Sequence, residues 1–248
     1  MHTIGGIEPT EENGILLLNG NKKTPLIKIT AGNLYLENLI CLEGSSPLLA
    51  ETNNNNYREI NVYGKNSKFF YSMTINNDVC MMKGVSLAVF QNCEASFGLK
   101  DGFNYHTRSG IIPKAVEINC RGIGNGNIED GNDQGSTIHD GGSIIRVGDV
   151  CAHSYGSNYA EQGTGTESWN IDCIGYESYC AVTTIQNANF FAYGNTKVFC
   201  DGCAGFGSFF NVNNSADKTK DETPGEIHLR NDRFSGVLTD NAVEIKYY

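Results

Sequence analysis

The sequence lacks the basic runs with which proteins bind nucleic acid or an anionic membrane surface. Its 18 Lys and Arg residues face 28 Asp and Glu residues, and the formal net charge is −10. Both of those partners attract clustered Lys and Arg. The apolar runs are short as well, Ile15 to Leu18 being among the longest, whereas a membrane-spanning helix needs about 20 apolar residues. We therefore expect no nucleic-acid partner and no insertion into a membrane.

A secretory leader and extended disorder are the next absences. Residues Met1 to Thr10 carry neither the basic start nor the apolar stretch of a signal peptide. The hydrophobic content is 40%, and 29 Gly stand beside only 5 Pro, which fits a chain that buries a core and turns often. The sequence indicates an ordered chain made in the cytoplasm. It either stays there, leaves by assembly into a particle and cell lysis, or is a piece of a longer protein.

Nine cysteines are present, an odd number that does not suit a fully paired disulfide framework. Reduced, buried thiols fit better, because free Cys packs as a small hydrophobic residue. Five of the cysteines are Cys93, Cys120, Cys151, Cys173 and Cys200, separated by 27, 31, 22 and 27 residues. This spacing indicates a repeat.

Each repeat contains a short strand followed by a turn. Residues 118–122 and 171–175 read apolar, polar, Cys, any residue, Gly, and residues 198–202 match except for Phe199 at the second place. This is the alternation of a strand with its Cys facing inward. No helical periodicity lies between the strands, and such repeats are typical of a β-solenoid, in which each coil covers the apolar face of the next. We expect one all-β domain over residues 1–248, a single-stranded right-handed parallel β-helix with coils of about 22–31 residues and loop insertions. The five cysteines would then stack as a ladder inside it.

The cysteines offer little to a metal ion. Only Cys200 and Cys203 have the Cys-x-x-Cys spacing of a zinc or redox site, and tetrahedral zinc needs four ligands. We expect neither a metal nor a cofactor. The Asn-rich turns have a structural use instead, because Asn tolerates left-handed backbone and can hydrogen-bond to its counterpart one coil away.

Three stretches interrupt the repeat, at residues 100–112, 125–142 and 152–162. Breaks in a regular scaffold commonly carry function. Counted from the cysteine of its coil, Asp101 lies at +8 and Glu161 at +10, while Asp140 lies 11 residues before Cys151. These offsets predict that the acids and the nearby His residues gather along one face.

The same stretches resemble a known group of proteins. The segments Asp101 to His106 (DGFNYH) and Ser136 to Val147 (STIHDGGSIIRV), with Asn158, Glu161 and residues 168–170, look like pectin-lyase-like β-helix regions of phage and prophage tail-spike or tail-fibre proteins. The resemblance covers about residues 85–205. It implies a homotrimer in a virion or phage-tail-like particle that binds a bacterial surface polysaccharide and, in some members, cleaves it. The Arg-x-Pro-x-x-Arg of pectate lyases and the Asn-Thr-Asp, Asp-Asp and Gly-His-Gly series of polygalacturonases are missing, which counts against those two activities.

The candidate catalytic residues are Asp101, His106, His139, Asp140 and Glu161. Two carboxyls about 5 to 9.5 Å apart would serve a glycoside hydrolase, whereas a His base with Arg108 or Arg146 neutralising a uronate would make a polysaccharide lyase. The candidate substrate-binding residues are Phe103, Tyr105, Tyr155 and Tyr159 for sugar rings, Asn104 and Asn158 for hydroxyls, and Arg108 and Arg146 for acids.

Structural readings of these residues stay open. Asp101-Gly102 and His139-Asp140-Gly141 are turn sequences in their own right, and Glu161 fits an exposed loop acid. Three function classes remain, namely a module that recognises a surface polysaccharide, a depolymerase on a spike, and a structural shaft or adhesion module of a tail fibre. We rank recognition first, catalysis second and the shaft third.

Overall fold

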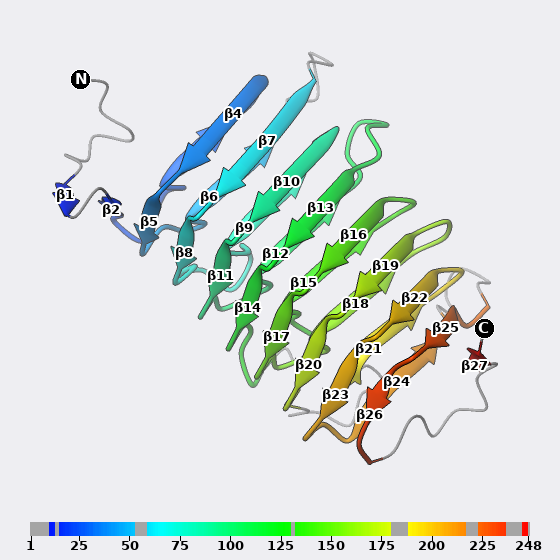
Figure 1. Ribbon diagram of the computed structural model, residues 1–248. Coiled ribbons are helices and arrows are strands. Elements are labelled where there is room, and N and C mark those ends of the chain that lie inside the picture. The colour runs from blue at the N-terminus through cyan, green and yellow to red at the C-terminus, as the bar shows by residue number, and fades with distance from the viewer. Residues whose placement is uncertain are drawn as a thin grey trace.

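The chain forms three long parallel β-sheets arranged around a common axis (Figure 1). The computed structural model describes residues 10–12, 15–52, 59–129, 132–179, 188–216, 223–236 and 245–247. Those residues contain strands and turns and no helix. The expected all-β, right-handed parallel β-helix is confirmed. In the described part of the chain, no helix is long and apolar enough to cross a membrane.

Each sheet takes one strand from every coil, and neighbouring strands pair in parallel. Sheet 1 comprises β1 (Thr10–Glu12), β2 (Ile15–Asn19), β5 (Leu39–Leu42), β8 (Lys68–Phe70), β11 (Glu94–Ser96), β14 (Arg121–Ile123), β17 (Val150–Ala152), β20 (Ile174–Tyr176), β23 (Ala204–Phe206) and β26 (Arg233–Phe234). Sheet 2 comprises β4 (Gly32–Glu37), β7 (Ile60–Lys65), β10 (Leu87–Gln91), β13 (Lys114–Ile118), β16 (Ser143–Val147), β19 (Glu167–Ile171), β22 (Lys197–Asp201), β25 (Glu226–Arg230) and β27 (Ile245–Tyr247). Sheet 3 comprises β3 (Ile27–Ile29), β6 (Leu48–Glu51), β9 (Cys80–Lys83), β12 (Phe103–His106), β15 (Ser136–His139), β18 (Tyr159–Gln162), β21 (Ala188–Tyr193) and β24 (Phe210–Ser215). Among the strands that the structure describes, only the β1–β2 pair at one end is antiparallel.

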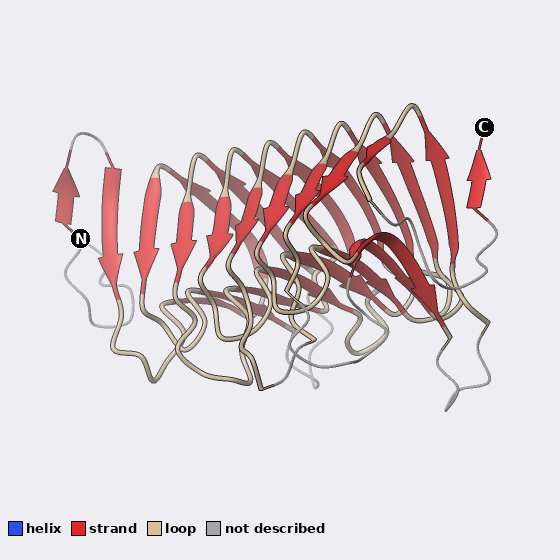
Figure 2. Cartoon of the chain, turned by 90° about the horizontal axis from the view of Figure 1, so that it is seen from below, coloured by secondary structure: helices blue, strands red, loops and turns tan. Residues whose placement is uncertain are grey.

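A coil runs from sheet 3 to sheet 2 and then to sheet 1, as in β9, β10 and β11. Viewed from below, the chain turns tightly between sheets 2 and 1 and makes its longer loops between sheets 1 and 3 (Figure 2). Of the expected insertion at 125–142, only residues 125–135 belong to one of these loops, between β14 and β15, whereas residues 136–139 form β15 and continue the repeat. Extra residues also occur between sheets 3 and 2, as at residues 107–113, and in neither place do they disturb the pairing of the strands.

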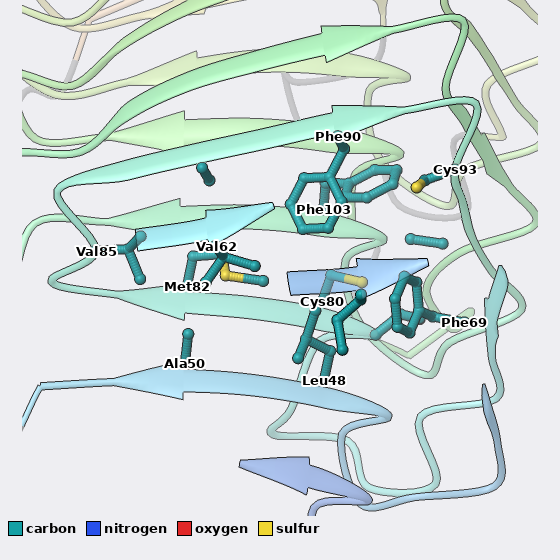
Figure 3. Packing of buried hydrophobic residues seen from close by; sticks show 14 of the residues in the cluster. Leu48, Ala50, Val62, Phe69, Cys80, Met82, Val85, Phe90, Cys93 and Phe103 are labelled. Atoms are coloured by element: carbon teal, nitrogen blue, oxygen red, sulfur yellow. The ribbon is translucent and has the colours of Figure 1, made fainter. Parts of the chain in front are cut away.

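The interior is filled by side chains that stack in columns, one from each coil. In sheet 3, Leu48, Cys80 and Phe103 pair in register and are all buried. Phe90 of sheet 2 packs against Phe103 with ring centroids 5.2 Å apart, and Figure 3 shows these rings with Cys93 beside them. Burial of each such side chain contributes about 1.5–3 kcal/mol, so the coils are held together mainly by apolar contact along the axis.

The expected ladder of five cysteines is only partly right. Cys93, Cys120 and Cys173 each directly precede a sheet 1 strand, in one column that also holds Asp149, Cys203 and Asp232. Cys151 lies two positions further along and pairs with Gly175, and Cys200 lies in sheet 2, opposite Asn170. Every column of equivalent side chains repeats once per coil, with the same spacing in sequence. The spacing of the cysteines therefore could not show which column each one belongs to. The eight described cysteines are all free and buried.

An asparagine ladder stabilises the turn between sheets 2 and 1, as the sequence predicts. Asn38, Asn66, Asn92 and Asn119 occupy equivalent places in successive coils, each with φ between 49° and 55°. The side-chain amide of Asn92 donates to Asn66 Oδ1 at 3.0 Å, and that of Asn66 donates to Asn38 Oδ1 at 3.4 Å. Asn thus supplies both the left-handed backbone and the bond between coils.

Candidate functional site

A groove of about 170 Å³ lies on the outer face of sheet 3, beneath the long loops. Its floor is formed by strand residues, and its wall by the turns that lead from sheet 1 into sheet 3. The floor consists of Met81, Lys83, Asn104, His106, His139 and Gln162, and the wall of Asn76, Asp78, Lys100, Asp101, Asn132 and Gln134. Of the residues selected from sequence, the groove brings together Asp101, Asn104, His106 and His139.

Two stacked carboxyls stand at the wall. Asp78 and Asp101 hold the same place in successive coils, two residues before β9 and β12, and the Asp101 backbone N–H donates to the Asp78 carboxylate. Burial raises the pKa of Asp78 to about 7, against the lowering effect of Lys83. Burial and then the neighbouring Asp78 raise the pKa of Asp101 well above its usual range. The pair therefore holds at least one proton near neutral pH.

The Asp101 carboxyl is already used by the scaffold. Its Oδ1 accepts from the backbone N–H of Gln134 at 2.6 Å, and its Oδ2 accepts from the Asn104 side-chain amide at 2.5 Å. The next residue, Gly102, approaches the Gly135 carbonyl so closely that a Cβ atom would collide with it. The structural reading of Asp101-Gly102 as a tightly packed turn is supported, although the turn borders the groove.

Two histidines form the centre of the floor. His106 and His139 stack with ring centroids 4.2 Å apart and planes inclined by 17°. Burial, and then the positive charge of Lys83, lower the pKa of His106 to about 4. His106 is therefore neutral near pH 7. His139 Nε2 lies 3.3 Å from Thr137 Oγ1, within hydrogen-bonding distance.

Asn104 and two lysines complete the polar lining. Asn104 is buried, at 3% exposure, and its Oδ1 has no hydrogen-bond partner among the described residues. Lys100 Nζ lies 3.1 Å from Asp133 Oδ1. Lys83 is half-buried on the floor, next to His106 in the parallel pairing.

Five of the predicted site residues lie inside the β-helix and cannot reach a groove ligand. These are Phe103, Tyr105, Arg146, Tyr159 and Glu161, each 1% exposed or less. The prediction that Glu161 joins Asp101 on one outer face is wrong. In a strand, neighbouring side chains point to opposite faces, so Asn104 and His106 face outward where Phe103 and Tyr105 face inward.

The interior polar residues form a closed network around Arg146. Its Nη1 lies 2.7 Å from Glu161 Oε1, and its Nε donates to Ser136 Oγ at 2.9 Å. Burial opposes the charge of this guanidinium, but Glu161 and Glu117 outweigh it and raise the pKa of Arg146. Glu117 Oε1 in turn accepts from Tyr105 at 2.7 Å. The partners of Arg146 are thus the protein's own carboxylates, and the expected uronate contact is not available to it.

The remaining candidates lie away from the groove. Asp140 is exposed in a turn with φ 53°, and its carbonyl accepts from Thr107 Oγ1 at 2.8 Å. Arg108 forms an ion pair with Glu51. The expected grouping with Asp101 therefore fails for Asp140 as well.

The aromatic and amide candidates after Cys151 also have partners within the protein. Tyr155 packs against Tyr179 with ring centroids 5.9 Å apart, and the buried Asn158 donates to Asn189 Oδ1 at 2.8 Å.

The sequence-based selection missed Asp78, Lys83, Gln134 and Gln162, all of which line the groove. A signal for them exists in the coil register. Residues 78–83, 101–106, 134–139 and 157–162 are equivalent segments, and the last position of each is Lys, His, His or Gln. Aligning the interrupted stretches on these segments, and not on the cysteines, would have found this column.

The chain has no counterpart in the comparisons, since no family model, no curated protein and no solved structure matches it. In the parts of the chain that the structure describes, no group of three or more His, Cys, Asp or Glu residues is placed to hold a metal ion.

Proposed function

We propose that the groove on sheet 3 recognises a bacterial surface polysaccharide, as part of a phage tail-spike-like or tail-fibre-like particle of the pectin-lyase-like β-helix type. One observation carries the proposal, namely that amide, carboxyl and imidazole groups converge in one outward-facing groove. Such groups match the alternating donors and acceptors of sugar hydroxyls. Neither a shaft nor a purely structural module needs them to converge.

Recognition is favoured over cleavage because the Asp101 carboxyl in the groove is already hydrogen-bonded to the protein. A glycoside hydrolase needs a free acid and a free base or nucleophile, whereas both oxygens of Asp101 already accept hydrogen bonds from the protein. Cleavage stays the second candidate, because a carboxyl whose pKa is raised is a proton donor near pH 7, and Asp101 has this property.

The test is retention of the purified chain on a panel of bacterial capsular and O-antigen polysaccharides, with reducing ends and absorbance near 235 nm followed in parallel. His139→Ala should lose retention, because it removes half of the stacked floor. Phe206→Ala, which removes half of a stacked aromatic pair with Tyr176 on the outer face of sheet 1, should keep it. New reducing ends without unsaturated products would show that the chain also hydrolyses the glycan, and unsaturated products would show that it cleaves the glycan by elimination. Absence of both retention and cleavage on every glycan would reject the proposal in favour of the shaft.

Assembly into a homotrimer is a further part of the proposal, and it requires an apolar contact surface. The outer face of sheet 2 carries a column of apolar side chains in which Ile145 pairs with Trp169 and Trp169 with Phe199. Ile145 is 42% exposed and Trp169 37%. Light scattering should give three copies for the unmodified chain and one for Trp169→Glu. A single copy in both would reject assembly through this face.

A further inference from the structure

Lys83 stands on the groove floor without an ion-pair partner among the described residues. Its neighbours on the same face are paired. Arg108 and Lys28 both contact Glu51, Lys28 Nζ lying 3.7 Å from Glu51 Oε2, and Lys100 contacts Asp133. Glu51 pairs with Lys83 along the backbone, yet its carboxylate is taken by those two other cations. The ammonium of Lys83 is therefore the uncompensated charge of the floor.

The other ionisable groups of the floor and wall do not fully offset this charge. Burial raises the pKa of Asp78 to about 7, and burial together with Asp78 raises the pKa of Asp101 well above its ordinary range, so the two carboxyls carry only part of their negative charge at neutral pH. His106 is neutral there, because burial and Lys83 lower its pKa to about 4. The charge of Lys83 is therefore offset only in part within the groove, although the whole chain is acidic.

Asn104 adds an acceptor next to this charge. Its amide nitrogen is held by Asp101, which fixes the side chain and leaves Oδ1 as a buried atom without a partner. A buried acceptor without a donor costs about 1–3 kcal/mol. A ligand hydroxyl in the groove would remove this cost, so a ligand that carries a hydroxyl near an anionic group would match both Asn104 and Lys83.

We propose that the groove binds an anionic sugar residue, with the Lys83 ammonium contacting its acidic group and Asn104 Oδ1 accepting a hydrogen bond from one of its hydroxyls. The inference rests on the proposed recognition of a polysaccharide and specifies its class. A carboxylate and a sulfate share the required charge. A neutral sugar would leave Lys83 uncompensated in a partly desolvated site, and a bare anion would leave Asn104 without a donor.

The experiment is ligand-observed NMR titration of the full chain with glucuronate, glucose 6-sulfate and glucose. Lys83→Gln removes the charge and keeps a polar side chain of similar length. Lys114→Gln makes the same change at the exposed start of β13 in sheet 2 and serves as the matched control. Thermal unfolding of the three proteins verifies that they are folded.

We expect glucuronate, glucose 6-sulfate or both to bind more tightly than glucose, and the difference between the two separates carboxylate from sulfate. Lys83→Gln should weaken this binding about tenfold or more, the effect of one charged hydrogen bond, and Lys114→Gln should leave it unchanged. Equal binding of glucose, or equal loss in both Lys variants, would overturn the inference while leaving recognition of a polysaccharide intact. Binding of none of the three sugars would also overturn it, and retention on the polysaccharide panel would then decide the proposed function separately.

Discussion

The imidazole rings of His106 and His139 lie face to face on adjacent strands, 4.2 Å apart between centroids. The parallel register of β12 and β15 produces this contact, because it places equivalent side chains one strand spacing apart, about 4.8 Å. Two imidazolium ions could not be held at this distance without strong repulsion. The stack therefore depends on at least one neutral ring.

Acid should weaken the fold through His106. Because its pKa is lowered to about 4 from 6.5, the group contributes stability that is present above pH 6.5 and is lost as the pH falls towards 4. We expect the loss to be on the order of 2 kcal/mol. Chemical denaturation of His106→Gln and the unmodified chain between pH 7 and 4 measures it, the variant losing less. Parallel curves for the two proteins would contradict the assigned pKa.

The buried Asp78 carboxyl should make the free energy of unfolding fall as the pH rises from 4 to 7, the opposite of the effect of His106. Its pKa is raised to about 7 from 3.8, so its contribution is fully present below pH 3.8 and is lost as the pH rises through 7. Relative to the unmodified chain, Asp78→Asn should therefore gain stability between pH 4 and 7, on the order of a few kcal/mol. Glu129→Gln, which changes the same charge in an exposed turn, is the control. No gain in Asp78→Asn would show that the buried carboxyl stays ionised.

The architecture could be predicted from sequence because it rests on a repeated local pattern. Alternating apolar residues, Asn and Gly turns and a steady coil length all follow from neighbours along the chain, and the ladder from Asn38 to Asn119 follows the prediction. The Cys column could not be assigned, because one coil length is common to every column of the solenoid.

The site was predicted only in part, because side chains along a strand alternate between the interior and the outer face, and a shift of one residue reverses the face. His106 and Asn104 were correctly selected and lie in the groove, whereas Tyr105 between them faces the interior. Glu161 and Arg146 have the charges of a surface site, and their burial follows only from the pairing of β18 and β16 within the coils. The amino-acid composition does not show whether these two charged side chains are buried or exposed.

Breaking the interior network should cost stability and leave the groove intact. Removing one partner of a buried ion pair costs about 3–5 kcal/mol, so Glu161→Gln and Arg146→Met should both lower the free energy of unfolding strongly. Arg121→Met, at an exposed position of β14, should change it little. Urea titration measures the effect. If Glu161→Gln kept full stability but abolished cleavage of a glycan that the chain degrades, the catalytic assignment of Glu161 would be restored.

The asparagine ladder allows its two contributions to be separated at Asn92. Its φ of 52° is left-handed, and its side chain donates to Asn66 Oδ1 at 3.0 Å. Asn92→Gly removes the bond but tolerates the backbone, whereas Asn92→Ala removes the bond and adds the left-handed penalty of about 1–2 kcal/mol. Urea titration should therefore rank the unmodified chain above the Gly variant and the Gly variant above the Ala variant. Gly and Ala variants of equal stability would mean that the turn relaxes out of the left-handed conformation, and a Gly variant as stable as Asn would mean that the exposed side-chain bond contributes nothing.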